Sequence, residues 1–236
     1  MGILLNGNKP SKIIYNGAES SLYFNGSKIW PEGDPYNPLN LPAKTIRIKM
    51  KSGSSMPSIS DATVTAVQGQ PDVYDVYKDS SNWYRLIFWN SQLLEVLGAN
   101  TTEITNMQEM FYRCESLVSV ALFDTSNVTI TQAMFFRCTS LTTLPLFNTS
   151  NVTNMLSMCN SCTSLTSIPL FNTSKAANMA SMFENCTNVQ SGALALYQQA
   201  STQANPPSNH TGTFKNCGAN TTTGAAELAQ IPEDWK

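Results

Sequence analysis

Four cysteines recur at intervals of 24 residues, and this spacing constrains the fold more strongly than any other feature of the sequence. A fixed period of roughly 20–29 residues is typical of proteins built from stacked repeats. Methionine stands four residues before each of these cysteines, and leucine or valine stands three residues after it. The repeated positions predicted to form the core are Met110, Phe111, Cys114 and Leu117; Met134, Phe135, Cys138 and Leu141; Met158, Cys162 and Leu165; and Met182, Phe183 and Cys186. Positions eight and nine after the cysteine, such as Leu146-Phe147, are apolar in the same register and are predicted to point inward as well.

The apolar spacing within one repeat predicts its secondary structure. Met155, Met158, Cys159 and Cys162 are spaced as i, i+3, i+4 and i+7, which is typical of one face of a short helix. From Leu165 onward, apolar and polar residues alternate, which is typical of a short strand. The predicted fold class is therefore an α/β solenoid of the leucine-rich-repeat type. Each 24-residue turn would hold one short helix and one short strand, with the strands on the concave face.

Both ends of the repeat region differ from its middle. A degenerate repeat opens near Ile87, where Asn90 takes the place of the cysteine. After the fourth cysteine the period lengthens, and the added residues fall in a predicted helix over 193–203. A further helix over 225–231 and Trp235 are predicted to close the stack, because the exposed end of a repeat array must be covered.

The first thirty residues follow a different pattern. Asn-Gly pairs begin at Asn6, Asn16 and Asn25, and this dipeptide is preferred in two-residue hairpin turns. We therefore expect a small β-meander, preceding small β-strands that run to the start of the stack. The predicted strands of the second unit cover 45–51, 62–67, 73–77 and 83–89. The predicted organisation is a β-hairpin anchor over 1–31, a Pro-rich linker over 32–43, a small β unit over 44–86, the solenoid over 87–218 and a helical cap over 219–236.

The repeat has a specific resemblance. The segments 147–155 (FNTSNVTNM) and 182–187 (MFENCT) resemble the BspA-like leucine-rich repeats of bacterial surface proteins and gut phage proteins. The likeness covers roughly residues 87 to 222. It implies a module that binds macromolecules or surfaces, and it supplies no catalytic residue. The Asn-Gly hairpins look like the attachment ends of phage tail and capsid-associated proteins.

Composition argues against several classes of partner. Charged residues make up 13% of the chain, the formal net charge is −2, and the 14 Lys and Arg are spread along its length. Nucleic-acid binding through phosphates needs a basic stripe, so we expect no nucleic-acid partner. No apolar run approaches the roughly 18 residues of a membrane span, so we expect no membrane insertion. The N-terminus lacks a basic leader, and no signal peptide is expected there.

Few residues offer reactive chemistry. Cys159 and Cys162 form a C-x-x-C pair, for which redox or zinc chemistry competes with a structural role. The repeat favours the structural role, because Cys162 is the repeated cysteine and Cys159 replaces a repeated phenylalanine. Cysteines of adjacent turns could approach disulfide distance, but free buried thiols are favoured. His210 is the only histidine, and no carboxylate pair is patterned around it. We therefore expect no catalytic residue, no cofactor and no metal site.

The outward positions of the predicted strands give a candidate binding strip. Its residues are Ser119, Thr143, Pro145, Ser167 and Pro169. This neutral surface would suit carbohydrate or a protein loop. The function expected from the sequence is a non-catalytic phage virion structural protein that displays an adhesion module for a host surface protein or carbohydrate. Residues 1–31 would bind other virion subunits, and a homo-oligomer is possible. The alternative is a bacterial cell-surface or secreted adhesin. An enzyme would need a pocket of convergent carboxylates between the solenoid and the β unit.

Overall fold

A computed structural model describes residues 39–55, 59, 61–87 and 89–236, together with the backbone of three short strands before them. These strands are β1 (Lys12–Ile13), β2 (Leu22–Phe24) and β3 (Ser27–Trp30). They pair in the order β1-β2-β3 with antiparallel neighbours, so the predicted β-meander is confirmed. The Asn-Gly turns that predicted it lie outside the described residues.

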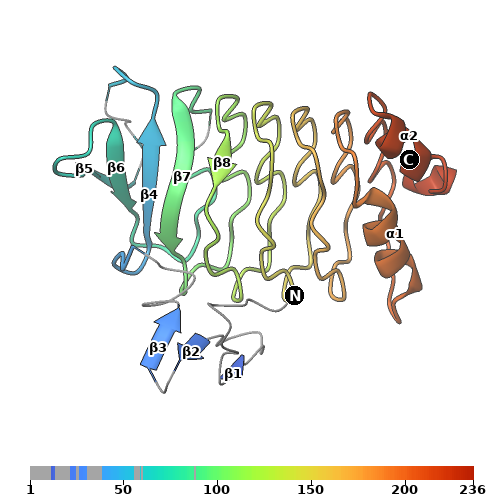
Figure 1. Ribbon diagram of the computed structural model, residues 1–236, viewed down its shortest axis with the longest axis horizontal. Coiled ribbons are helices and arrows are strands. Elements are labelled where there is room, and N and C mark those ends of the chain that lie inside the picture. Colours follow the sequence, from blue (N-terminus) through green and yellow to red (C-terminus); the bar gives the residue numbers. More distant parts are fainter. Residues whose placement is uncertain are drawn as a thin grey trace.

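A second, five-stranded sheet begins the main body of the protein (Figure 1). Its order is β5-β6-β4-β7-β8, and only the β7–β8 pair is parallel. The strands are β4 (Thr45–Met50), β5 (Thr63–Ala66), β6 (Val73–Tyr77), β7 (Leu93–Asn100) and β8 (Ser119–Val120). The predicted strand over 83–89 is wrong, because its described residues form turns.

The central strand β4 shows why this sheet forms. Its residues alternate between the two faces, so Ile46 and Ile48 are fully buried on the core side. On the opposite face, Arg47 pairs with Asp75 on β6, with Nε 2.6 Å from Oδ1. The apolar face is thereby fixed toward the core, and the charged face is held by pairs between neighbouring strands.

Beyond β8 the chain continues as a row of stacked 24-residue turns (Figure 1). Parallel bridges join equivalent residues of successive turns, which are Asn82, Asn106, Ile130, Asn154, Asn178 and Asn209. The sheet and the stack share one continuous hydrophobic core, in which the repeated methionine, phenylalanine, cysteine and leucine positions predicted to form the core are buried. The register read from the cysteines therefore describes the stacking correctly.

The local structure of each turn corrects the predicted fold class. The described residues contain only two α-helices, both near the C-terminus, and the stacked turns contain none. The segment predicted to be helical consists instead of two consecutive four-residue turns, for example Met107–Met110 and Phe111–Cys114. In each, the fourth N–H donates to the first carbonyl, at 3.2 and 3.1 Å. The protein is thus a mixed β-sheet extended by stacked turns, and the α/β solenoid with one helix and one strand per turn is wrong.

Backbone hydrogen bonding explains why no helix forms. Alternate N–H groups of this segment donate to the following repeat: those of Met107, Phe111 and Arg113 bond the carbonyls 23 residues later, at 3.0, 2.9 and 2.7 Å. A helix would use those donors within its own segment. The third residue of each four-residue turn adopts positive φ, as in Glu109 (53°) and Arg113 (58°). Two turns in succession bury residues at i, i+3, i+4 and i+7, which is the same spacing that a helix produces.

The predicted strands are also mostly absent from the described turns. Only one repeat forms such a strand, β8. Ala121 follows β8 and donates to Val96 O at 2.9 Å, and the equivalent positions of the next two repeats are Pro145 and Pro169. Proline has no N–H to donate to a ladder, so regular pairing stops there. The inter-turn bonds that remain include Thr166 N–H to Thr142 O at 3.1 Å.

Two helices and a short 3-10 helix cover the far end of the stack (Figure 1). They are α1 (Ala193–Thr202), α2 (Thr222–Leu228) and η1 (Glu233–Trp235). Both predicted helices are confirmed, with α2 starting and ending three residues earlier than expected. Trp235 is buried and stacks 6.2 Å from the Phe214 ring. The predicted role of Trp235 as a lid over the last turn is confirmed.

Candidate functional site

The cysteines are buried structural groups. All six are free thiols, and Cys159 and Cys162 are fully buried. Each repeated cysteine also donates a hydrogen bond across the stack: Cys138 Sγ lies 3.2 Å from Phe111 O, and Cys162 Sγ lies 3.1 Å from Phe135 O. Burial raises the pKa of all six thiols, that of Cys114 to about 12. Since the thiolate is the reactive form, these thiols are poorly placed for redox or metal chemistry.

His210 belongs to the C-terminal closure. Its ring stacks on Trp235 with centroids 4.2 Å apart, and its Nε2 lies 3.3 Å from Asp234 Oδ2. Its Nδ1 lies 3.1 Å from Pro207 O. Both ring nitrogens therefore face groups that hold the lid in place. Within the described residues, no cluster of three or more His, Cys, Asp or Glu could hold a metal ion.

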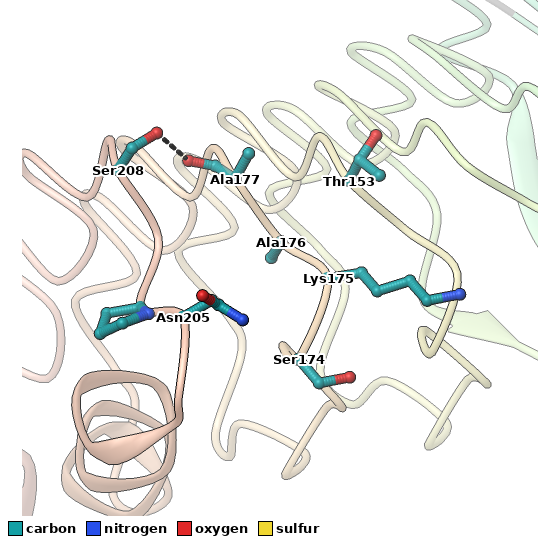
Figure 2. Close-up of a pocket in the computed structure, with 8 residues that line it drawn as sticks. Thr153, Ser174, Lys175, Ala176, Ala177, Asn205 and Ser208 are labelled. Carbon is teal, nitrogen blue, oxygen red and sulfur yellow. Dashed lines mark hydrogen bonds between the residues drawn. The ribbon is translucent and has the colours of Figure 1, made fainter.

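A shallow depression lies between the last regular turns and the segment after α1 (Figure 2). It has a volume of about 420 Å³ and is lined by Thr153, Ser174, Lys175, Ala176, Ala177, Asn205, Pro206 and Ser208. The Lys175 ammonium donates to Asn151 Oδ1 at 2.6 Å, and Ser208 Oγ donates to Ala177 O at 3.1 Å. The lining contains no carboxylate and no histidine, so this depression offers hydrogen bonds and one cation but no acid–base pair.

The strip predicted to bind ligands is only partly a polar surface. Thr143 and Ser167 are exposed, while Ser119, Pro145 and Pro169 are half-buried. The prediction that position eight after the cysteine points inward is wrong: Leu146 and Leu170 are 60% and 52% exposed. Because this part of the turn is not a regular strand, strict inward and outward alternation does not hold there. The strip is thus a mixed surface of hydroxyls, prolines and leucines.

A second surface lies at the corners of the stacked turns. The two middle residues of each Phe111–Cys114-type turn lie outside the hydrophobic core, and those that the structure describes are half-buried or exposed, apart from the buried Asn160; their equivalents change along the stack. In the first turns they are aromatic or arginine. We call the residues Trp89, Tyr112, Arg113, Phe136 and Arg137 the corner row. Later turns carry polar or charged residues other than arginine at these positions, including Asn160, Ser161, Glu184 and Asn185.

The corner row is held rigidly by the backbone. Trp89, Arg113 and Arg137 have φ angles of 56°, 58° and 57°, so their side chains leave the backbone in the same direction. The N–H of Trp89 donates to Tyr112 O at 2.8 Å, and that of Arg113 donates to Phe136 O at 2.7 Å. Successive members therefore stand about 4.8 Å apart, which is the spacing of hydrogen-bonded strands.

The side chains of the corner row contact one another. The rings of Tyr112 and Phe136 stack with centroids 4.8 Å apart and planes 5° from parallel. The Arg113 guanidinium lies 5.3 Å from the centroid of the Trp89 ring, yet Trp89 remains 58% exposed. Arg113 also lies near Glu115, with Nε 3.8 Å from Oε1. The row thus presents the partly exposed Trp89 ring and the stacked Tyr112 and Phe136 rings beside the guanidinium groups of Arg113 and Arg137.

Sequence reasoning missed the corner row, although it carried a signal. The repeat alignment concentrated on positions that stay the same in every turn. The corner positions change from aromatic and arginine to serine and asparagine, and packing does not require that change because these side chains leave the core. Variation at outward positions of an otherwise regular repeat was therefore the feature that pointed to a binding surface.

Comparisons with known proteins match part of the chain. Residues 84–197, just under half of the sequence, match a family described as "Mycoplasma protein of unknown function, DUF285". The match spans the corner row and the regular turns. No curated protein and no solved structure shows significant similarity. In the part of the chain that the structure describes, no helix is long and apolar enough to cross a membrane.

Proposed function

We propose that this protein is a non-catalytic adhesion module that binds host-surface carbohydrate or protein through its stacked turns. The observation that carries the proposal is Trp89, an indole left 58% exposed beside the Arg113 guanidinium. Exposing a large aromatic side chain has a solvation cost, and tryptophan, tyrosine and arginine are enriched where proteins bind partners. The same proposal places the chain among the BspA-like leucine-rich-repeat proteins that its repeats resemble.

The rigidity of the stack supports this function. Each turn is hydrogen-bonded to the next through alternate backbone N–H groups, and the side chains beneath the corner row belong to one continuous buried core. A surface that is already ordered loses little conformational entropy on binding, which favours affinity. Adhesion also needs no reactive group, and the buried thiols and the lid histidine are used for structure.

A binding assay with a matched control tests the proposal. Fluorescently labelled protein would be applied to bacterial cells and to mucin-coated surfaces. Trp89→Ala should lower retention at least tenfold, whereas Leu146→Ala should leave it unchanged, since Leu146 is equally exposed but lies outside the corner row. Both variants should keep the unfolding midpoint of the parent. Equal retention of the three proteins would contradict the proposal.

For the setting of this module, we propose a phage virion, in which the N-terminal segment attaches to other virion subunits. The sheet β1–β3 supports this role, because it is separate from the five-stranded sheet and a sheet of this size is marginal alone. The alternative setting is a bacterial surface. Light scattering would compare the full chain with a chain that starts at Thr45. A defined oligomer only for the full chain would support attachment through the N-terminal segment, and two monomers would favour the alternative.

A further inference from the structure

We propose that the corner row binds a carboxylate-bearing glycan, with the sugar rings lying along the stack from Trp89 toward Arg137. This inference rests on the proposed adhesion function and adds the chemical class of the ligand. It is carried by three properties of the row: its regular spacing, its exposed aromatic face and its available guanidinium groups.

Regular spacing favours a ligand that is itself a repeating chain. Trp89, Arg113 and Arg137 occupy the same position of three consecutive turns, with nearly identical φ angles. The backbone bond from Arg137 N–H to Asn160 O at 2.8 Å fixes the third of them as firmly as the first two. A linear polymer can therefore present one unit to each turn.

The aromatic residues suit the apolar faces of sugar rings. Trp89 has one face beside the Arg113 guanidinium and remains 58% exposed. Tyr112 and Phe136 are half-buried and stack on each other, so they form a rigid aromatic part of the row beside Arg113 and Arg137. A pyranose ring can lay its C–H face on an indole while its hydroxyl groups stay in water. This combination explains why a large aromatic side chain stands at the surface.

The arginines determine the expected charge of the ligand. Arg85, on the neighbouring corner, is engaged by Glu109, with Nε 2.7 Å from Oε2. The Arg113 guanidinium lies beside the Trp89 ring and makes a long ion-pair contact of 3.8 Å to Glu115. Arg137 is exposed, with no side-chain hydrogen bond or ion pair to the residues that the structure describes. Guanidinium groups bind carboxylates in a bidentate manner. Arg113 and Arg137 are therefore placed to bind the carboxylates of successive sugar units.

The number of turns that carry an aromatic residue or arginine at this position limits the length of the binding site. Beyond Arg137, the equivalent positions are Ser161 and Asn185, which carry no charge. A nucleic acid would also present anions and rings, but its affinity depends on many phosphate contacts, and the chain as a whole has a net charge of −2. The short row fits two or three sugar units better than a longer polyanion.

The test uses the full chain and two probes, oligogalacturonate and oligosialic acid, measured by isothermal titration calorimetry. Methyl-esterified oligogalacturonate is the matched ligand control, because it keeps the sugar rings and loses the charge. Arg137→Gln is the test variant, and Lys175→Gln is the matched protein control, since Lys175 lies in the depression away from the row. We expect at least one acidic probe to bind. Esterification of oligogalacturonate, if it binds, and Arg137→Gln should each weaken binding at least tenfold, and Lys175→Gln should have no effect.

Several results would overturn this assignment. Failure of both acidic probes to bind, equal binding of the esterified probe, or an unchanged affinity of Arg137→Gln would each exclude a carboxylated glycan at the row. Equal competition by oligoglutamate or by single-stranded DNA would show that the row recognises charge without recognising sugar. If the acidic probes fail but Trp89→Ala still abolishes retention on cells, the ligand class is wrong and the adhesion function stands. If retention is also unaffected, both are wrong.

Discussion

Alkaline pH should destabilise this protein steeply, because its six buried thiols keep their protons in the folded state. Burial raises the pKa of every cysteine from the ordinary value of 9.0, that of Cys114 to about 12. Between these two values the unfolded chain releases thiol protons and the folded chain does not. The stabilising contribution of the buried thiols is therefore fully present below pH 9, and it is lost as the pH rises toward their folded-state pKa.

The size of the effect follows from the number of thiols. One pKa unit corresponds to about 1.4 kcal/mol, so each thiol that ionises only on unfolding lowers the free energy of unfolding by somewhat less than about 1 kcal/mol at pH 9.5. All six cysteines are buried and free, so the total loss between pH 7.5 and 9.5 reaches at most about 5 kcal/mol, when every thiol keeps its proton in the folded state. That loss rivals the whole stability of a protein at the lower end of the usual range, roughly 5–15 kcal/mol.

Urea unfolding followed by circular dichroism at pH 7.5, 8.5 and 9.5, with a non-thiol reductant present, would measure this loss. Cys138→Ala is the control: it should be less stable at every pH but lose about one sixth less stability as the pH rises, since five thiols still titrate. Tyrosine and lysine ionise mainly above pH 9.5 and contribute little in this window. A free energy of unfolding that stays constant from pH 7.5 to 9.5 would refute the reasoning.

Three substitutions test the architecture of the turns by urea unfolding at neutral pH. Leu141→Ala should lower the free energy of unfolding by about 3 kcal/mol, because Leu141 is fully buried. Leu146→Ala should lower it by less than about 0.5 kcal/mol, because Leu146 is exposed. Similar losses for the two variants would show that Leu146 is part of the core. Thr149→Val should lower the free energy of unfolding by about 1–3 kcal/mol, because it removes the hydrogen bond that Thr149 Oγ1 donates to Asn172 O (2.8 Å) at a buried position. An unchanged free energy would mean that this carbonyl finds another donor. Ser157 has φ of 53°, so Ser157→Val should destabilise by about 1–3 kcal/mol and Ser157→Gly should not; equal stabilities would argue against the double turn.

The sequence was most informative about the inward side chains. A 24-residue period places the same apolar residues on the core of every turn, and this placement depends only on counting along the chain. Met110, Cys114 and Leu117 are fully buried, as are most of their equivalents along the stack. The closing helices and the Trp235 lid could also be predicted, because an uncapped stack would expose its last apolar layer.

The conformation of each turn could not be predicted in the same way. Two consecutive four-residue turns and one short helix bury the same spacing of residues, so Met155, Met158, Cys159 and Cys162 are compatible with both. The choice depends on where alternate backbone N–H groups find acceptors, and here the acceptors lie 23 residues away on the next repeat. Such a partner exists only once the turns have stacked.

Neither candidate binding surface could be predicted correctly from the sequence, because both depend on the backbone conformation of the turns. The predicted strip assumed strand alternation, and the prolines and irregular turns there left Leu146 and Leu170 exposed instead. The corner row depends on positive φ at Trp89, Arg113 and Arg137, which no local propensity of tryptophan or arginine would indicate. The sequence by itself determined the repeat, its register and the inward residues, because burial follows the period. Tertiary structure decided the backbone of each turn and therefore which outward side chains meet, because the hydrogen bonds that fix it join residues of different turns.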